Sequence, residues 1–135
     1  MPGFLTDLVN NQLLDCLFGG RQIAPPPTLY LGLSLGLSRK DGRVREPSDG
    51  SYSRVAVPNT SEHFPPASCG AKSNLTAITF PSPASDWGPI RSVFVADSPT
   101  GGNVLATADL PTSRAYEGGG PAPTITAHAL FLSHS

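Results

Sequence analysis

The residue types that most often carry chemistry are sparse in this sequence. The three histidines are His63, in a proline-rich stretch, His128, within an apolar run near the end, and His134, the penultimate residue. A hydrolase needs a nucleophile, a base and a group that orients the base, and the sequence singles out no such set. We therefore predict no catalytic residues and no enzymatic activity.

Metal and phosphate sites are equally unsupported. Cys16 and Cys69 lack the short paired spacing of a zinc site, and two cysteines are too few for a disulfide framework. The glycine runs at Gly101-Gly102 and Gly118–Gly120 lack the lysine and following helix of a phosphate-binding loop. We predict two free thiols, no metal and no cofactor.

Trp87, the single tryptophan, leaves two interpretations open. Exposed beside a loop, its ring would stack on a sugar, and Tyr116 offers a second such position. A tryptophan that enters a strand is more often a core anchor, because its large apolar ring is best buried. We favour the core anchor.

The elements that must position any site begin with a hairpin. Ile90–Ala96 is rich in β-branched and aromatic residues, and Val104–Leu110 is apolar almost throughout. Between them, residues 97–103 form a turn in which Gly101 and Gly102 are free to adopt positive φ. With a shorter strand at Ala77–Phe80, this stretch predicts the centre of the fold, which the other segments cover.

Further strands are expected at Thr28–Leu37, Ser51–Val57, Asn74–Phe80 and Thr124–Ser133, each with alternating side chains. In Thr28–Leu37 one face carries leucines, and the other, with Gly32 and Gly36, is small enough for a second chain or the N-terminal helix to approach. The expected core residues are Leu29, Leu31, Leu33, Leu35, Val55, Val57, Ile78, Phe80, Phe94, Val104, Leu105, Ile125 and Phe131.

Met1–Phe18 has the spacing of an amphipathic helix, ended by Gly19-Gly20. Its apolar stripe includes Leu5, Leu8 and Leu13. The helix either packs on its own sheet, which is the commoner arrangement, or forms an arm that packs on a neighbouring subunit.

Ser38–Gly50 is the most charged segment and reads as a long, turn-rich loop. One interpretation is an ordinary solvated loop. The other is a docking loop whose arginines bind carboxylates of a partner. The candidate docking residues are Arg39, Arg43, Arg45 and Glu46.

Composition limits the function classes. Charged residues make up 14% of the 135 residues, against about a quarter in typical domains, and the net charge is −1. This balance predicts no nucleic-acid partner, and no apolar run is long enough to span a bilayer. With 15 prolines and 14 glycines, we predict one domain over residues 1–135. It comprises an N-terminal helix or arm over 1–20 and a β body over 28–135. The fold is an all-β antiparallel sandwich or barrel of about six to eight strands with one short helix.

A set of short motifs resembles a known family. They are Leu29–Leu33, Gly50–Val57, Phe64–Ala67, Ala77–Pro81, Trp87-Gly88 and Thr100–Ala106, in that order after an N-terminal helix. This order resembles a family of small virion proteins of tailed bacteriophages, often labelled tail fibre proteins, some of which act as capsid cement or decoration proteins. The resemblance implies no catalytic residues. The sequence departs from the family pattern at Arg39–Glu46 and Pro111–Pro123, where partner contacts are expected.

The resemblance and the low charge together predict a structural virion protein made in the host cytoplasm. Because the sequence has no heptad shaft or repeat, we favour capsid cement on the outer shell. Its partners would be the major capsid protein and copies of itself, as a trimer or dimer. The expected partner-binding residues are Leu5, Leu8, Leu13, Arg39, Arg43, Arg45 and Glu46. The alternative is a tail fibre or baseplate component that binds host-surface glycans.

Overall fold

The predicted hairpin forms the centre of the main sheet. The computed structural model describes residues 2–38, 43–48 and 50–133. β8 (Gly88–Ala96) pairs antiparallel with β9 (Val104–Tyr116), and Gly101 and Gly102 in the turn have φ of 60° and 71°. The hairpin and its turn are confirmed. β9 runs six residues past the predicted end at Leu110, and after an irregular shift in register its last residues pair with Gly88–Ile90.

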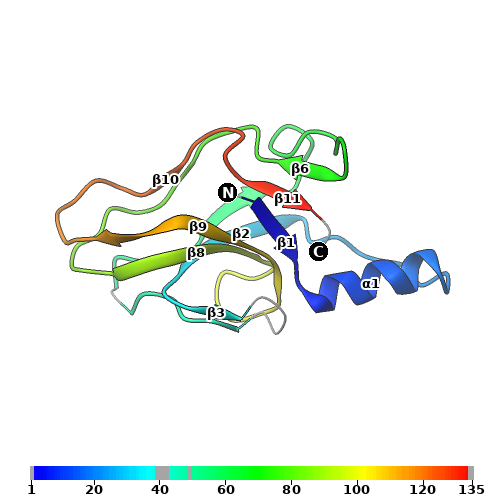
Figure 1. The fold of residues 1–135 in the computed structure, drawn as a ribbon, viewed down its shortest axis with the longest axis horizontal. Helices are drawn as coiled ribbons and strands as arrows, with labels where there is room; N and C mark the ends of the chain where they lie inside the picture. Colours follow the sequence, from blue (N-terminus) through cyan, green and yellow to red (C-terminus); the bar gives the residue numbers. More distant parts are fainter. Residues whose placement is uncertain (1, 39–42, 49, 134–135) are drawn as a thin grey trace.

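Seven strands form the main sheet, in the order β5-β2-β8-β9-β1-β11-β6, and two small pairs, β10-β7 and β3-β4, lie beside it (Figure 1). The remaining bounds are β1 Pro2–Leu5, α1 Asp7–Leu17, β2 Thr28–Ser34, β3 Leu37–Ser38, β4 Arg43–Val44, β5 Val55–Pro58, β6 Ala71–Ser73, β7 Ile78–Thr79, β10 Thr124–Ile125 and β11 Phe131–Ser133. The predicted fold class, mainly β with one short helix, is confirmed. Every neighbouring pair is antiparallel except β1 and β11, which are parallel.

The prediction of a helix from Met1 is wrong for its first residues. Residues 2–5 form β1, which lies between β9 and β11 in the main sheet, and the helix begins only at Asp7. Gly3 explains the placement, since a Cβ there would lie 2.9 Å from the Thr107 carbonyl oxygen and 3.0 Å from the Ala108 Cβ. Only a glycine fits this close approach between strands.

One face of the main sheet carries the larger core. Leu31, Val95 and Ala106 stand opposite one another across β2, β8 and β9, as do Leu33, Val93 and Ala108. The covering residues come from the β7–β10 pair and the loops around it: Phe64, Ile78, Phe80, Trp87, Ile125 and Leu130. This arrangement confirms the leucine face predicted for Thr28–Leu37.

The opposite face, here called the second face, has a smaller apolar cluster of Phe94, Ala96 and Val104, with Val44 packed against it. Gly32 lies directly opposite Phe94. A Cβ at Gly32 would lie 2.6 Å from the Phe94 Cε1 and 2.8 Å from the Tyr52 hydroxyl oxygen. At Gly32 the small face of Thr28–Leu37 therefore admits Phe94 and Tyr52 of the same chain and not the N-terminal helix, whereas nothing lies within 4 Å of a Cβ placed at Gly36.

The C-terminal segment differs from the prediction of one strand over Thr124–Ser133. β10 and β11 are separated by a turn in which His128 has a φ of 63°. The buried Asn74 holds this turn, since its backbone oxygen accepts from the His128 N–H at 2.7 Å and its side-chain oxygen accepts from the Leu130 N–H at 3.0 Å. The turn reverses the alternation, so that Leu130 is 1% exposed and Phe131 is 46% exposed.

Most of the predicted core is confirmed. Leu31, Leu33, Val57, Ile78, Phe80, Phe94, Val104 and Ile125 are buried, and Leu29, Leu35 and Val55 pack against them while partly exposed. Leu105 is only half-buried because a bulge between Val95 and Ala96 leaves it without a cross-strand partner on β8. Phe131 is the clear error, for the reason given above.

Candidate functional site

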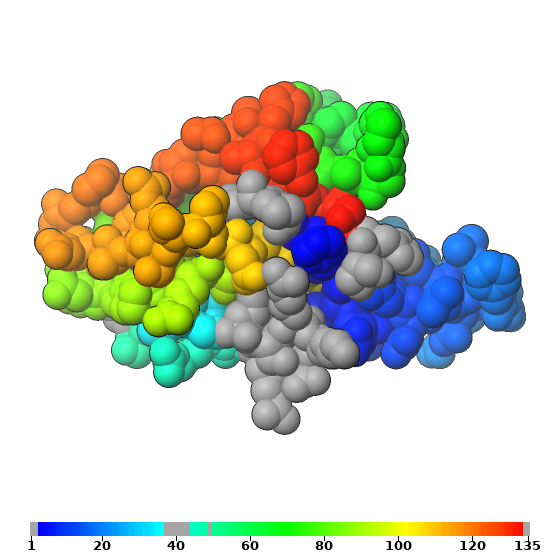
Figure 2. Space-filling view, in the orientation of Figure 1, coloured from blue at the N-terminus to red at the C-terminus, as the bar shows by residue number. Residues whose placement is uncertain are grey.

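The least buried part of the described chain is an arm, defined here as residues 7–27, which comprises α1 and the extended segment that returns to β2. In Figure 2 the arm protrudes at one end of the molecule. No residue of α1 is buried, and at its tip Leu17 and Phe18 are 72% and 80% exposed. An eleven-residue helix is marginal in water on its own, because its stability normally comes from packing an apolar face. The arm therefore presents an apolar surface that the described chain does not cover.

Both ends of the arm are fixed to the body. At the start, the Thr6 N–H donates to the Leu105 oxygen at 2.9 Å and the Thr6 hydroxyl donates to the Val104 oxygen at 2.8 Å. At the end, the Asn59 side chain donates to the Pro26 oxygen at 2.9 Å. These contacts hold the base of the arm in place while its tip stands free of the sheet (Figure 1).

The arm includes two of the three predicted helical contact residues. Leu8 is exposed and Leu13 half-buried on α1, whereas Leu5 lies in β1 and packs against the larger core. The prediction that Leu5 shares the helical surface is wrong, because the strand ends before the helix begins. Leu14 and Phe18, which the stripe does not include, are both exposed. The face that carries Val9, Leu13 and Cys16 is half-buried, and the other residues of α1 except Asn10 are exposed.

The predicted docking loop is divided by the structure. Arg39 lies outside the described residues, and Arg43 pairs through its backbone with Ser38 in the β3–β4 hairpin. Arg45 is exposed. Glu46 faces inward instead, toward Arg54.

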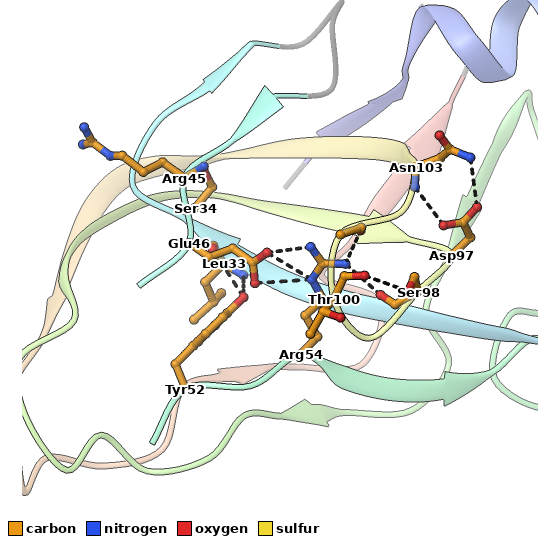
Figure 3. Close-up of polar contacts among 11 residues, drawn as sticks. Leu33, Ser34, Arg45, Glu46, Tyr52, Arg54, Asp97, Ser98, Thr100 and Asn103 are labelled. Carbon is orange, nitrogen blue, oxygen red and sulfur yellow. Dashed lines mark hydrogen bonds and ion pairs between the residues drawn. The ribbon is translucent and has the colours of Figure 1, made fainter. Parts of the chain in front are cut away.

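Arg54 binds Glu46 and the turn between β8 and β9 (Figure 3). Its Nη2 lies 2.6 Å from the Glu46 Oε1, its Nε donates to the same carboxylate at 3.1 Å, and its Nη1 donates to the carbonyl oxygens of Ser98 at 2.7 Å and Gly101 at 2.9 Å. The guanidinium also lies 5.0 Å from the centre of the Phe94 ring, and the side chain is 4% exposed. Glu46 is therefore used within the chain, and its predicted role as a partner contact has no support from this geometry.

Tyr52 extends this cluster toward the larger core. The Leu33 N–H donates to its hydroxyl at 3.0 Å, and its ring meets the Trp87 ring edge to face at 5.4 Å. Burial raises the pKa of Tyr52 far above its ordinary value, and the hydrogen bond to Glu46 raises this pKa further. The phenol therefore stays neutral wherever the protein is folded at ordinary pH.

Trp87 is a core anchor, as predicted. It is buried, and its indole N–H donates to the Ser51 hydroxyl at 3.1 Å. Its ring is covered by Tyr52 on one side and lies 6.2 Å from Tyr116. The ring therefore has no free face on which a sugar would stack.

One serine has the spacing of a nucleophile elbow, Gly-x-Ser-x-Gly, at Gly32–Gly36, and the prediction of no catalytic residues does not take it into account. This serine, Ser34, is fully buried at the end of β2. Its hydroxyl donates to the Gly36 oxygen and accepts from the Arg45 N–H at 3.1 Å. All of the hydrogen bonds found for it are to the backbone, so the hydroxyl fixes the turn toward β3.

The described part of the chain contains neither a group of side chains that could hold a metal ion nor a helix that could span a membrane. There, no three side chains of His, Cys, Asp or Glu gather as they would around a metal ion, and Cys16 and Cys69 are free thiols. Among residues 2–38, 43–48 and 50–133, no helix has the length and apolar character needed to cross a bilayer.

The chain matches a known protein family. The model of a family described as Podophage GP4 fiber I protein gp80 matches residues 5–133 of the chain, from the end of β1 to the end of β11. No curated protein matches the chain.

Proposed function

The chain belongs to the family of podophage GP4 fiber I protein gp80, and from this premise we propose that it is a structural protein of a podophage tail fibre. In this proposal it assembles with further copies of itself, as a trimer or dimer, through the arm. The exposed apolar tip of the arm is the observation that carries the proposal.

Repetition is the physical reason for choosing a second copy as the partner. The described sheet has no heptad shaft or solenoid to give length, so a fibre built from it must repeat contacts between chains. The arm suits such a contact because its only charged residues are Asp7, Asp15 and Arg21, with Asp15 and Arg21 3.9 Å apart. Burying the tip against another apolar surface therefore leaves few charges to desolvate.

Capsid cement is not proposed further, because the family description names a fibre. Counting the copies of the protein in purified virions separates the two placements. A few dozen copies or fewer per virion fit a fibre. Hundreds of copies per virion would indicate a capsid protein and contradict the proposal.

Substitution at the tip of the arm tests assembly directly. Analytical ultracentrifugation of the unmodified chain is expected to show an oligomer, and the double variant Leu17→Ser/Phe18→Ser is expected to sediment as a monomer, because polar side chains remove the apolar contact. Leu75→Ser is the matched control, since Leu75 is exposed but lies in the loop between β6 and β7. It should leave the oligomer intact.

Point substitution is preferable to deletion, because removing residues 1–18 would also remove β1 from the main sheet. Circular dichroism should show that the double variant keeps its β-structure. A monomeric unmodified chain at micromolar concentration, or an oligomer that survives the double substitution, would show that the arm does not join copies.

A further inference from the structure

A cavity of about 600 Å³ lies beside the second face, where the segment after β4 meets β8 and β9. Its volume is within the range of roughly 300–1,000 Å³ that ligand sites usually have. Its polar lining consists of Arg45, Arg91, Ser92 and Asp109, and its apolar lining includes Leu35 and Pro89. It is distinct from the arm, with which it shares no residue.

Ser92 is the reason to regard this cavity as a binding site. It is 1% exposed, and within the described part of the chain its hydroxyl oxygen has no hydrogen-bond partner. Across the sheet it stands between Ser34 on β2 and Asp109 on β9. The Ser34 hydroxyl is occupied by backbone groups. Because a buried hydroxyl without a partner is costly, rotation of the Ser92 side chain toward a ligand in the cavity would gain it both a donor and an acceptor contact.

Two arginines give the cavity its positive charge. Arg45 is held by its backbone, since its N–H donates to the Gly36 oxygen at 3.2 Å and its oxygen accepts from the Leu35 N–H at 2.8 Å. Its side chain points away from Glu46 and Arg54 (Figure 3). In the part of the chain that the structure describes, neither the Arg45 nor the Arg91 guanidinium is seen in an ion pair. Asp109 contributes one negative charge and has an interaction of its own.

We propose that this cavity binds a sugar that carries a carboxylate. A guanidinium matches a carboxylate in a planar, two-bond geometry, and Arg45 and Arg91 supply two such groups. Ser92 provides the hydrogen bond that a ring hydroxyl needs, and Leu35 and Pro89 provide apolar surface for the C–H face of the ring. This proposal concerns ligand binding and does not depend on assembly through the arm.

Titration calorimetry at low salt tests the proposal with three probes: glucuronate, glucose and inorganic phosphate. Glucuronate is expected to bind saturably and to weaken as salt is added, because the ion pairs at the cavity mouth are screened. Glucose has a closely similar ring without the carboxylate, so it should bind at least about tenfold more weakly, as expected for loss of a charged hydrogen bond. Phosphate lacks the ring and should also bind more weakly.

The variants separate the site from the rest of the surface. Arg45→Ala and Arg91→Ala should each weaken glucuronate about tenfold. Ser92→Ala should weaken it too, without lowering the thermal unfolding midpoint, because no hydrogen bond within the described chain is lost. Arg21→Ala removes an exposed arginine on the arm and should leave binding unchanged.

Three outcomes would overturn the proposal: no saturable glucuronate binding, equal affinity for glucose or phosphate, or binding that survives both Arg45→Ala and Arg91→Ala. The monomeric Leu17→Ser/Phe18→Ser variant should bind glucuronate like the unmodified chain. That result keeps a failure of the sugar site distinguishable from a failure of the assembly proposal.

Discussion

The cluster around Arg54 and the arm differ in which side chains they bury. At Arg54, a charged side chain is buried and bound to Glu46 and to two carbonyl oxygens of the β8–β9 turn. On the arm, apolar side chains are exposed and Leu17 and Phe18 contact solvent. The contrast indicates that the Arg54 cluster makes its contacts within the chain, whereas in our proposal the arm makes its contacts with another copy. Removing contacts should therefore destabilise the first region and barely affect the second.

Arg54→Ala should have the largest effect. It leaves the partly buried Glu46 carboxylate and the Ser98 and Gly101 oxygens without their donor, and the free energy of unfolding in urea should fall by about 3 kcal/mol. Arg21→Ala is the control, since its ion pair with Asp15 is exposed and should contribute less than about 0.5 kcal/mol. Equal losses for the two variants would remove the distinction between the regions.

Gly32→Ala should have the next largest effect. The added methyl would overlap the Phe94 ring and lie 2.8 Å from the Tyr52 hydroxyl oxygen. Relieving that overlap should cost about 2 kcal/mol of unfolding free energy. Gly36→Ala is the matched control, because no atom lies within 4 Å of the Cβ it would add. A Gly32→Ala variant as stable as Gly36→Ala would show that the second face is loosely packed.

Tyr52→Phe should lower the unfolding free energy by about 1 kcal/mol at pH 7, because the Leu33 N–H loses its acceptor. The raised pKa of Tyr52 adds a pH dependence. Above about pH 10 the unfolded chain ionises this phenol and the folded chain does not, so the stabilising effect of Tyr52 decreases as pH rises.

The difference in unfolding free energy between the unmodified chain and Tyr52→Phe should therefore shrink above about pH 10. The expected change is up to about 1.4 kcal/mol per pH unit. Urea unfolding at several pH values between 7 and 11 measures the difference. A constant gap across that range would show that Tyr52 titrates normally in the folded protein.

Phe18→Ala should have the smallest effect. Its side chain makes little contact with the body, so the unfolding free energy measured at high dilution, where copies are separated, should change by less than about 0.5 kcal/mol. At higher protein concentration the unmodified chain should gain stability and the variant should not, since association stabilises the folded state. A large loss at high dilution would mean that the arm packs on its own sheet.

Local patterns predicted the centre of the fold well. The β8–β9 hairpin is visible from its β-branched residues and glycine turn, and the buried leucines of β2 from their alternation. Long-range pairing was not visible. Leu5 and Leu8 have helical spacing, yet Leu5 belongs to a strand because β9 and β11 leave a gap in which β1 fits. The break at His128 depends on Asn74, which lies far from it in the sequence.

The candidate sites were predicted in part. The apolar spacing of residues 8–17 indicates an interacting helix, but how much of that helix is exposed depends on where the sheet lies. The charged residues between 39 and 54 could form many different ion pairs. The fold brings Arg54 to Glu46 and places Arg45 in the lining of the cavity. Ser92 sits in an apolar strand, and nothing in its neighbours indicates a hydroxyl without a partner.

The position of β1 has a consequence for how the chain is made. The Ser133 hydroxyl and the Gly3 carbonyl, 130 residues apart in sequence, are 3.4 Å apart in the finished sheet. On a ribosome, β1 emerges before β11, and its edge toward β11 stays unpaired until residues 131–133 have been synthesised. Such an open edge invites pairing with other nascent chains, so translation that stops early yields an aggregation-prone product.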